Sequence, residues 1–261
     1  MKFVLVTGGK GGVGKTTLTA NLGVGLADRG ARILLVDLDF SLANLNVLFG
    51  LTPRATLEDF FTGDRELAEC IHKGPCGVHV LPGGSGCAEL SRDDPKRAER
   101  LAAELERLSA DYDLVIGDSA AGIGPDVLFF SQLADLVLVV TTPEPAALTD
   151  AYGLVKALDA TSTSSGREIP TPELFFNLVH GSSQAERLAA RLRGVCERFL
   201  ARSARLAGWL PRSNGVLQSS LTQRPFIGNS RSKEALEARC LLRLAQRLES
   251  RFSLSGTPAG V

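Results

Sequence analysis

Residues 8–17 read Gly-Gly-Lys-Gly-Gly-Val-Gly-Lys-Thr-Thr, a spacing of glycine, lysine and hydroxyl side chains that suits phosphate binding. The segment fits the pattern G-x-x-x-x-G-K-[ST], with Gly9, Gly14, Lys15 and Thr16 at the fixed positions. Glycines let backbone N–H groups turn inward and approach the phosphate oxygens closely. We expect Lys15 to reach the β- and γ-phosphates and the Thr16 hydroxyl to hold Mg²⁺. The segment therefore predicts a site for ATP and Mg²⁺.

A second lysine, Lys10, directly follows Gly9 and marks a deviant version of this loop. It indicates an ATPase that works as a dimer. The start of the following helix, with its N–H groups and dipole, also favours an anion. The residues expected to bind the nucleotide here are Gly9, Gly11, Gly12, Val13, Gly14, Lys15, Thr16 and Thr17.

Two acids stand where buried apolar runs end. Asp37 closes the run Arg-Ile-Leu-Leu-Val-Asp, and Asp118 closes Asp-Leu-Val-Ile-Gly-Asp. Asp39 follows two residues after Asp37. Ligands of open α/β sheets lie at the carboxyl ends of the strands, where a second magnesium element is usual in such ATPases. We therefore expect Asp37 and Asp118 to serve the metal together with Thr16.

The elements that must position these residues alternate between short apolar runs and helical patterns, which predicts an α/β fold with one doubly wound, mostly parallel sheet covered by helices on both faces. The predicted strands are 3–7, 32–37, 78–81, 113–118, 135–141, 173–179 and 205–210. The predicted helices are 15–29, 56–72 in two pieces, 95–109, 125–133, 147–159, 183–203 and 231–249. We expect one ATPase domain over 1–252, a surface loop at 161–166 and a disordered tail at 253–261.

Composition excludes several classes of protein. The 29 basic and 29 acidic residues cancel, so no global field recruits nucleic acid or a membrane. The five cysteines form no C-x-x-C pair, which suits a reducing compartment. The start of the chain lacks the charged and apolar regions of a signal peptide, and no apolar run approaches the roughly 20 residues of a membrane helix. We expect a cytoplasmic protein.

The sequence resembles the MinD/ParA family of deviant-loop ATPases, and within it the flagellar number and placement regulators of the FlhG group. The motifs that carry the resemblance are Lys-Gly-Gly-Val-Gly-Lys-Thr-Thr at 10–17, Asp37-Leu-Asp39, Leu-Ala-Asn-Leu-Asn-Val-Leu-Phe-Gly-Leu at 42–51, Asp-Ser-Ala-Ala-Gly at 118–122, and Thr-Thr-Pro-Glu-Pro at 141–145 followed by Thr-Asp-Ala-Tyr at 149–152. The likeness covers most of the chain and is strongest over 1–160.

The resemblance implies a role for each matching position. Lys10 would reach across an ATP-bound homodimer to the other subunit's phosphates, and Asp39 would orient the attacking water. Thr16 would bind Mg²⁺ directly, with Asp37 and Asp118 behind its waters. Asn177 would read adenine through its amide, and Pro211-Arg212 would lie along the base. The implied activity is slow ATP hydrolysis stimulated by a partner protein: a flagellar GTPase, a switch-complex protein or a regulator.

Departures from the family leave details open. Ser213 stands where relatives often have Asp, which weakens the expected contacts on the adenine side. The final helix carries a stripe of Leu241, Leu244 and Leu248, which we interpret as core packing. Its alternative is an amphipathic membrane helix, which would place the protein peripherally on the inner membrane.

One predicted helix has an arginine face. At 100° per residue, five arginines of the 183–205 segment fall on one side with no acid among them. Such a face could contact acidic lipid, DNA or an acidic protein, as in a ParA-like positioning ATPase, or it could simply be solvated. The five residues are Arg187, Arg191, Arg198, Arg202 and Arg205.

Other enzymes on the same fold remain alternatives. An ATP-dependent amide- or ring-forming synthetase would need a polar substrate pocket, which the sequence does not indicate. An iron–sulfur protein would need more cysteines: Cys87 lies in Gly-Gly-Ser-Gly-Cys-Ala, but Ala121 stands where a second ligand is expected. A tyrosine kinase would need a tyrosine cluster, and the chain has only Tyr112 and Tyr152.

Overall fold

A single eight-stranded sheet forms the centre of the molecule, with the strand order β3-β4-β2-β5-β1-β6-β7-β8. The computed structural model describes residues 1–40, 42–84, 95–200, 202–228 and 234–254. Within that part of the chain, every neighbouring pair of strands is parallel except β3 with β4. The strands are β1 (Phe3–Gly8), β2 (Ile33–Leu38), β3 (His72–Lys73), β4 (His79–Leu81), β5 (Leu114–Ala121), β6 (Leu136–Thr141), β7 (Glu173–Val179) and β8 (Arg205–Pro211).

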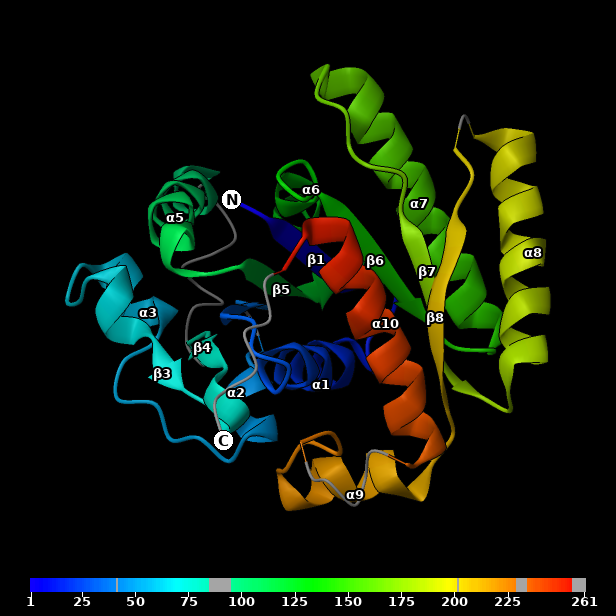
Figure 1. Cartoon of the computed structure of the whole chain (residues 1–261). Coiled ribbons are helices and arrows are strands. Elements are labelled where there is room, and N and C mark those ends of the chain that lie inside the picture. The colour runs from blue at the N-terminus through cyan, green and yellow to red at the C-terminus, as the bar shows by residue number, and fades with distance from the viewer. Residues whose placement is uncertain (41, 85–94, 201, 229–233, 255–261) are drawn as a thin grey trace.

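Helices cover both faces of this sheet (Figure 1). Helices α1 and α10 share one hydrophobic core with one face, and α5, α6, α7 and α8 share a second core with the other face. The helices are α1 (Lys15–Ala27), α2 (Leu45–Leu48), α3 (Leu57–Thr62), α5 (Pro95–Leu108), α6 (Pro125–Ser131), α7 (Pro145–Ser165), α8 (Ser182–Phe199), α9 (Asn214–Thr222) and α10 (Leu236–Phe252). Short 3₁₀ turns lie at Leu67–Cys70, Pro75–Gly77 and Ser109–Asp111.

The predicted fold class is confirmed, and each of the seven predicted strands is present. Central strands β1, β2 and β6 are buried along their whole length, because both faces of a doubly wound sheet are covered. Continuous apolar runs were therefore the right signal. Strand β3 was not predicted, since two paired residues leave no periodic pattern.

Two predicted helix ends are wrong. The segment 161–166, predicted as a surface loop, continues α7 as far as Ser165. Its hydroxyls bond backward along the helix, as Thr163 does to the Asp159 carbonyl, and Gly166 then ends the helix with φ of 67°. Helix α8 ends at Phe199 rather than at 203, because the backbone of Leu200 is extended.

The region from 56 to 72 contains two pieces as predicted, although the second is a 3₁₀ turn. Helices α2 and α9 were not predicted because each is short. The last helix begins at Leu236, later than predicted, and continues to Phe252. Of the predicted 231–249 helix, residues 231–233 lie outside the described residues. So do Cys87 and residues 255–261 of the predicted tail, whereas the Leu254 N–H donates to the Glu249 carbonyl.

The leucine stripe of the last helix packs in the core. Leu241, Leu244 and Leu248 are all buried with α1 against one face of the sheet. The core-packing interpretation is therefore confirmed and the membrane-helix alternative for this stripe is wrong. In the part of the chain that the structure describes, no helix combines the length and apolar character needed to span a bilayer.

Candidate nucleotide site

The predicted phosphate loop runs from the end of β1 at Gly8 to the start of α1 at Lys15. Gly14, directly before the helix, has φ of 97°, a conformation that side chains with a Cβ rarely adopt. At Gly9 the constraint is packing, because a Cβ there would collide with the Asp150 carbonyl in the second turn of α7. The glycines thus allow a tight loop that is pressed against α7.

Lys15 is buried at the base of the loop, with 8% of its surface exposed. Burial lowers the pKa of its ammonium group, and the nearby carboxylates of Asp118 and Asp39 oppose that shift. Lys15 therefore lies among the predicted metal-site acids, where its charge would attract bound phosphates.

Asp37 and Asp118 lie side by side at the carboxyl ends of β2 and β5, in register as neighbouring residues. Both carboxyl groups are buried. Burial is the main cause that raises the pKa of each, and the charge of Asp118 raises that of Asp37 further. A bound divalent cation would favour the charged form of both carboxylates, which makes this pair suited to a metal site.

Hydrogen bonds fix the two carboxylates in different ways. Asp37 accepts from the backbone N–H groups of Asp39, Asn44 and Leu45 at 3.1, 2.9 and 3.0 Å. Asp118 accepts from the Thr19 hydroxyl at 3.2 Å, and Thr16 lies near enough to oppose the rise in its pKa. The residue expected to hold Mg²⁺ therefore lies near the strand-end acid.

Asp39 lies at the start of the connection between β2 and α2. The carboxylate of Asp39 accepts the N–H of Leu42 at 3.0 Å. The backbone N–H of Asp39 in turn donates to the carboxylate of Asp37. These bonds hold Asp39 at the carboxyl edge of the sheet, close enough to Lys15 to affect its pKa.

Lys10 takes a different position from Lys15. Its ammonium group forms an ion pair of 3.1 Å with Glu144, which lies just before α7, and 41% of the lysine side chain is exposed. The second lysine of the loop therefore sits at the rim of the site and not among the buried carboxylates.

The residues predicted to bind adenine also lie along this edge. The Asn177 amide donates to the Val13 carbonyl at 2.9 Å, and its oxygen accepts the N–H of Leu178, so in this structure it braces the phosphate loop. The N–H of Arg212 donates to the Val179 carbonyl, which holds the end of β8 beside β7. Pro211 is buried and Arg212 is exposed. The Ser213 hydroxyl caps α9 by accepting the N–H of Gly215.

Comparison with known proteins assigns the family. Residues 1–169 match the protein family described as AAA domain. The antiactivator FleN of Pseudomonas aeruginosa is 35% identical over 261 residues, which is 100% of this chain and 90% of FleN. The chain belongs to the MinD/ParA family of AAA-domain ATPases.

Two further relatives agree with this assignment. The flagellum site-determining protein YlxH of Helicobacter pylori is 36% identical over 155 residues, covering 59% of this chain and 53% of that protein. The septum site-determining protein MinD of Pyrococcus horikoshii, solved in complex with Mg-ADP, superposes with a TM-score of 0.77 at 25% identity, over 100% of this chain and 99% of MinD. The MinD/ParA resemblance and its flagellar branch are therefore confirmed.

Three residues of the candidate site in this MinD/ParA chain were not predicted from its sequence. The Thr19 hydroxyl lies between Asp118 and the Lys15 carbonyl, Glu144 holds Lys10, and the Asp150 backbone packs on Gly9. Thr19 could have been found because it lies one helical turn after Lys15. The two contacts from the α7 region join segments more than 130 residues apart and have no local signal.

The prediction that five arginines share one face of a helix in this MinD/ParA chain is wrong. Because α8 ends at Phe199, Arg202 and Arg205 do not extend it. Arg202 instead turns inward, where it pairs with Asp159 at 2.8 Å and donates to the Ile169 carbonyl. Arg187, Arg191 and Arg198 remain on α8, and Arg198 lies over the ring of Phe199.

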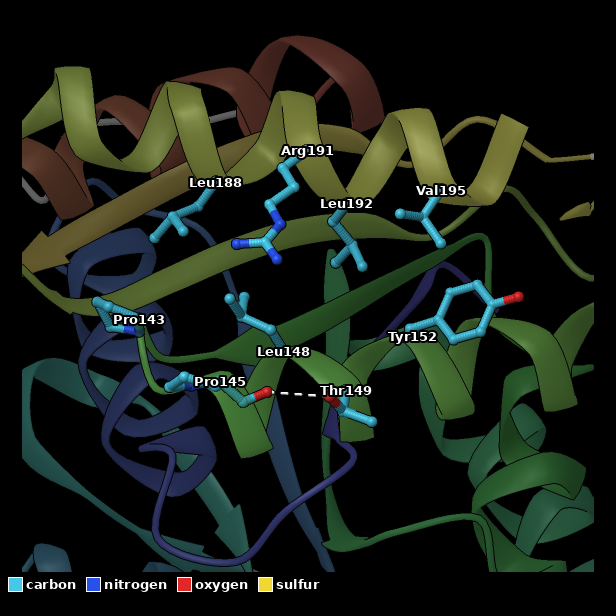
Figure 2. A pocket seen from close by; sticks show the side chains of 9 residues that line it. All are labelled: Pro143, Pro145, Leu148, Thr149, Tyr152, Leu188, Arg191, Leu192 and Val195. Carbon is cyan, nitrogen blue, oxygen red and sulfur yellow. Dashed lines mark hydrogen bonds between the residues drawn. The ribbon is translucent and has the colours of Figure 1, made fainter. Parts of the chain in front are cut away.

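Arg191 borders an open groove between α7 and α8, with a volume of about 350 Å³. Figure 2 shows side chains of α8 directed toward those of α7 across this groove. Leu148 and Tyr152 line it from α7, and Leu188 and Leu192 line it from α8. Its walls are mostly apolar, and Arg191 has no ion-pair partner among the described residues.

Proposed function

We propose that this chain is a Mg-ATP-dependent, dimerising switch ATPase of the MinD/ParA type that regulates the number, placement or assembly of flagella. The phosphate loop, the paired strand-end acids and the full-length similarity to FleN support the proposal. ATP would favour a homodimer, and slow hydrolysis to ADP and phosphate would separate it.

The observation that carries the proposal is the different placement of two lysines in one loop. Lys15 is buried among the carboxylates, whereas Lys10 lies at the exposed rim. A rim lysine held only by an exposed ion pair can be released at small cost, because such pairs contribute about 0–1 kcal/mol. Lys10 is therefore available to serve the phosphates of a second copy, as the resemblance implies.

The residues present also fit Mg²⁺ and a triphosphate. Mg²⁺ prefers oxygen ligands, and Thr16, Asp37 and Asp118 supply hydroxyl and carboxylate oxygens at one edge of the sheet. The buried hydroxyls of Thr7 and Thr142 near this edge have no hydrogen-bond partner among the described residues. Bound with ATP, the metal would neutralise charge that develops on the phosphates.

Each residue then has a distinct task in hydrolysis. Lys15 would bind the phosphates of its own subunit, and Asp39 would orient the attacking water. Lys10 of the second copy would stabilise the charge of the transition state, an effect of roughly 10³–10⁵ in rate for a cation supplied in trans. On the far side of the loop, Asn177, Pro211 and Arg212 would hold the base. Hydrolysis would thus depend on dimerisation.

A partner protein that stimulates hydrolysis would bind the groove between α7 and α8. The groove shares α7 with the contacts to Gly9 and Lys10, so a protein bound there could change the position of the loop. Arg191 favours an acidic segment. We infer a flagellar GTPase, a switch-complex protein or a regulator as the partner. We place the protein in the cytoplasm, with peripheral contact to the inner membrane or to DNA as the alternative.

The solution mass of Asp39→Ala with Mg²⁺ and ATP, and again with ADP, tests the proposed switch. Light scattering should find a dimer with ATP and a monomer with ADP, because binding is kept while hydrolysis is blocked. In the Asp39→Ala background, Lys10→Ala should lower the dimer fraction and the exposed control Lys73→Ala should not. A monomer with both nucleotides would overturn the switch and favour the synthetase alternative.

A second experiment tests the groove. Arg191→Glu and Leu188→Asp should abolish stimulation by a partner while leaving the basal turnover of the purified protein unchanged. Arg205→Glu, on β8 outside this groove, is the matched control. Full stimulation of both groove variants would exclude this surface.

A further inference from the structure

Large hydrophobic side chains that remain exposed gather at one edge of the molecule. Of the seven such residues in the described part of the chain, six lie on segments that follow the carboxyl ends of the strands, and Phe199 at the end of α8 is the exception. Scattered single exposures need no explanation, but a concentration at one edge marks an interaction surface. The six are Leu42, Val47, Ile123, Leu217, Leu221 and Leu236.

These six residues form two groups on either side of the phosphate loop. Leu42 and Val47 follow β2, and Ile123 follows β5. The other three lie on α9 and at the start of α10, beyond β8. Because β1 and its loop lie between β5 and β6 in the sheet, the nucleotide site is flanked by apolar residues in both directions.

Helix α9 is the clearest part of this surface. Leu217 and Leu221 lie one turn apart and are 56% and 68% exposed. The same helix turns Val216 and Ser219 toward the protein, which leaves Leu217 and Leu221 on its outer side. Asn214–Thr222 contains no charged residue. Depletion of charge is typical of the centre of protein interfaces, and it disfavours anionic lipid or nucleic acid as the partner.

The helix is also held firmly in this orientation. Its first turn is capped by the Ser213 hydroxyl, and the preceding Arg212 N–H donates to β7. At its other end lies Gln223, whose side chain is 3.6 Å from the position that a Cβ on Gly50 would take, just after α2. The two leucines are therefore presented by an element that is fixed at both ends.

We infer that Leu217 and Leu221 pack against a second copy of this chain and extend the ATP-dependent dimer interface beyond the nucleotide site. The inference rests on the proposed function, since it takes that dimer as its frame. In a twofold dimer, an apolar group beside the axis meets either the same group or the other group of the second copy, depending on the direction of the axis. With apolar groups on both sides of the loop, either orientation of an axis near the loop brings apolar side chains together. The occupant that this symmetry favours is the second copy.

The experiment compares dimer dissociation constants in the Asp39→Ala background with Mg²⁺ and ATP. Leu217→Asp/Leu221→Asp should weaken the dimer by roughly 30-fold or more, because it places charges where two apolar side chains would be buried. Phe199→Asp is the matched control, since it adds a charge at an equally exposed hydrophobic residue on the opposite edge. It should leave the dimer unchanged.

Two further measurements separate the possible results. Thermal unfolding and binding of a fluorescent ATP analogue by the monomer should be normal in the α9 variant, because both leucines are exposed. A variant dimer as tight as that of the background protein would overturn the α9 contact while leaving the switch intact. A background protein that stays monomeric with ATP would overturn the proposed function and this inference together.

Discussion

Acids at the two edges of the sheet have opposite surroundings. At the amino edge, Asp113 binds the backbone and guanidinium of Arg32, and Glu173 pairs with Arg247 and Arg251. At the carboxyl edge, Asp37 and Asp118 face each other, and the nearest cation that acts on Asp118 is Lys15. The same residue types are therefore neutralised at one edge and left with little opposite charge at the other.

The pKa values respond in opposite directions. The hydrogen bond from Arg32 lowers the pKa of Asp113, while burial raises the pKa of Asp118. Pairing at the amino edge stabilises the charged form of its acids. At the carboxyl edge the pairing is incomplete, so a bound cation would stabilise the charged carboxylates there. Perturbed acids of the second kind are typical of functional sites. The shifts therefore differ in direction between the edge whose acids are paired with arginines and the edge where the predicted metal site lies.

The largest expected effect concerns catalysis at the carboxyl edge. Lys10→Ala should lower ATP turnover by about 10³-fold while ATP binding stays near normal, because the rim lysine is expected to act on the other subunit's phosphates. Steady-state phosphate release and nucleotide titration measure the two quantities. Arg32→Ala at the amino edge should leave turnover unchanged, and wild-type turnover in Lys10→Ala would remove the role in trans.

Nucleotide binding should depend on the buried lysine of the same loop. Lys15→Ala should weaken ATP binding on the order of 100-fold, because charge-assisted bonds to the phosphates are lost. Isothermal titration measures the change. Lys2→Ala is the amino-edge control, since Lys2 donates to the Phe252 carbonyl far from the loop. Equal affinity in the two variants would contradict the placement of the phosphates.

The close contact between the loop and α7 should appear in stability. Gly9→Ala should lower the free energy of unfolding by about 1–3 kcal/mol, because its Cβ would collide with the Asp150 carbonyl. Gly11→Ala is a matched change in the same loop, where a Cβ meets nothing within 4 Å. Urea unfolding of the nucleotide-free proteins should separate them, and equal midpoints would argue against the contact.

The smallest effect tests the two edges directly through pH. Without Mg²⁺ and nucleotide, the raised pKa of Asp118 means that wild-type stability falls as pH rises above about 4, so Asp118→Asn should gain on the order of 1 kcal/mol relative to wild type by pH 8. The lowered pKa of Asp113 has the opposite effect on the pH dependence of stability. Asp113→Asn should be less stable than wild type at neutral pH, by no more than about 1 kcal/mol, and the difference should vanish as pH falls through the folded pKa.

Unfolding curves in EDTA from pH 8 down to below pH 4 measure both slopes, because the lowered pKa of Asp113 lies below its ordinary value. Slopes of the same sign for Asp113→Asn and Asp118→Asn would break the comparison between the edges. With added Mg²⁺ and ADP, the wild type should become more stable than Asp118→Asn, since only the wild-type carboxylate can serve the metal.

Much of the fold could be predicted because its signals are local. Buried parallel strands are continuous apolar runs, and a loop that must wrap phosphate needs glycines at fixed spacing. The positions of Asp37 and Asp118 followed from the same rule, since each acid directly ends such a run. The predicted roles of Lys10, Asp39 and Asn177 remain predictions.

What the sequence could not supply depends on contacts between distant segments. The predicted arginine face, which was built on helical spacing, failed because α8 ends at Phe199 and Arg202 pairs with the half-buried Asp159 on α7. Likewise, the Glu144 partner of Lys10, the α7 carbonyl beside Gly9 and the exposed leucines of α9 were decided only when the strands were ordered in the sheet. Periodicity and motif spacing are set by neighbours along the chain, so the sequence determined the elements and the loop. Burial and pairing are set by neighbours in space, and those only the tertiary structure decided.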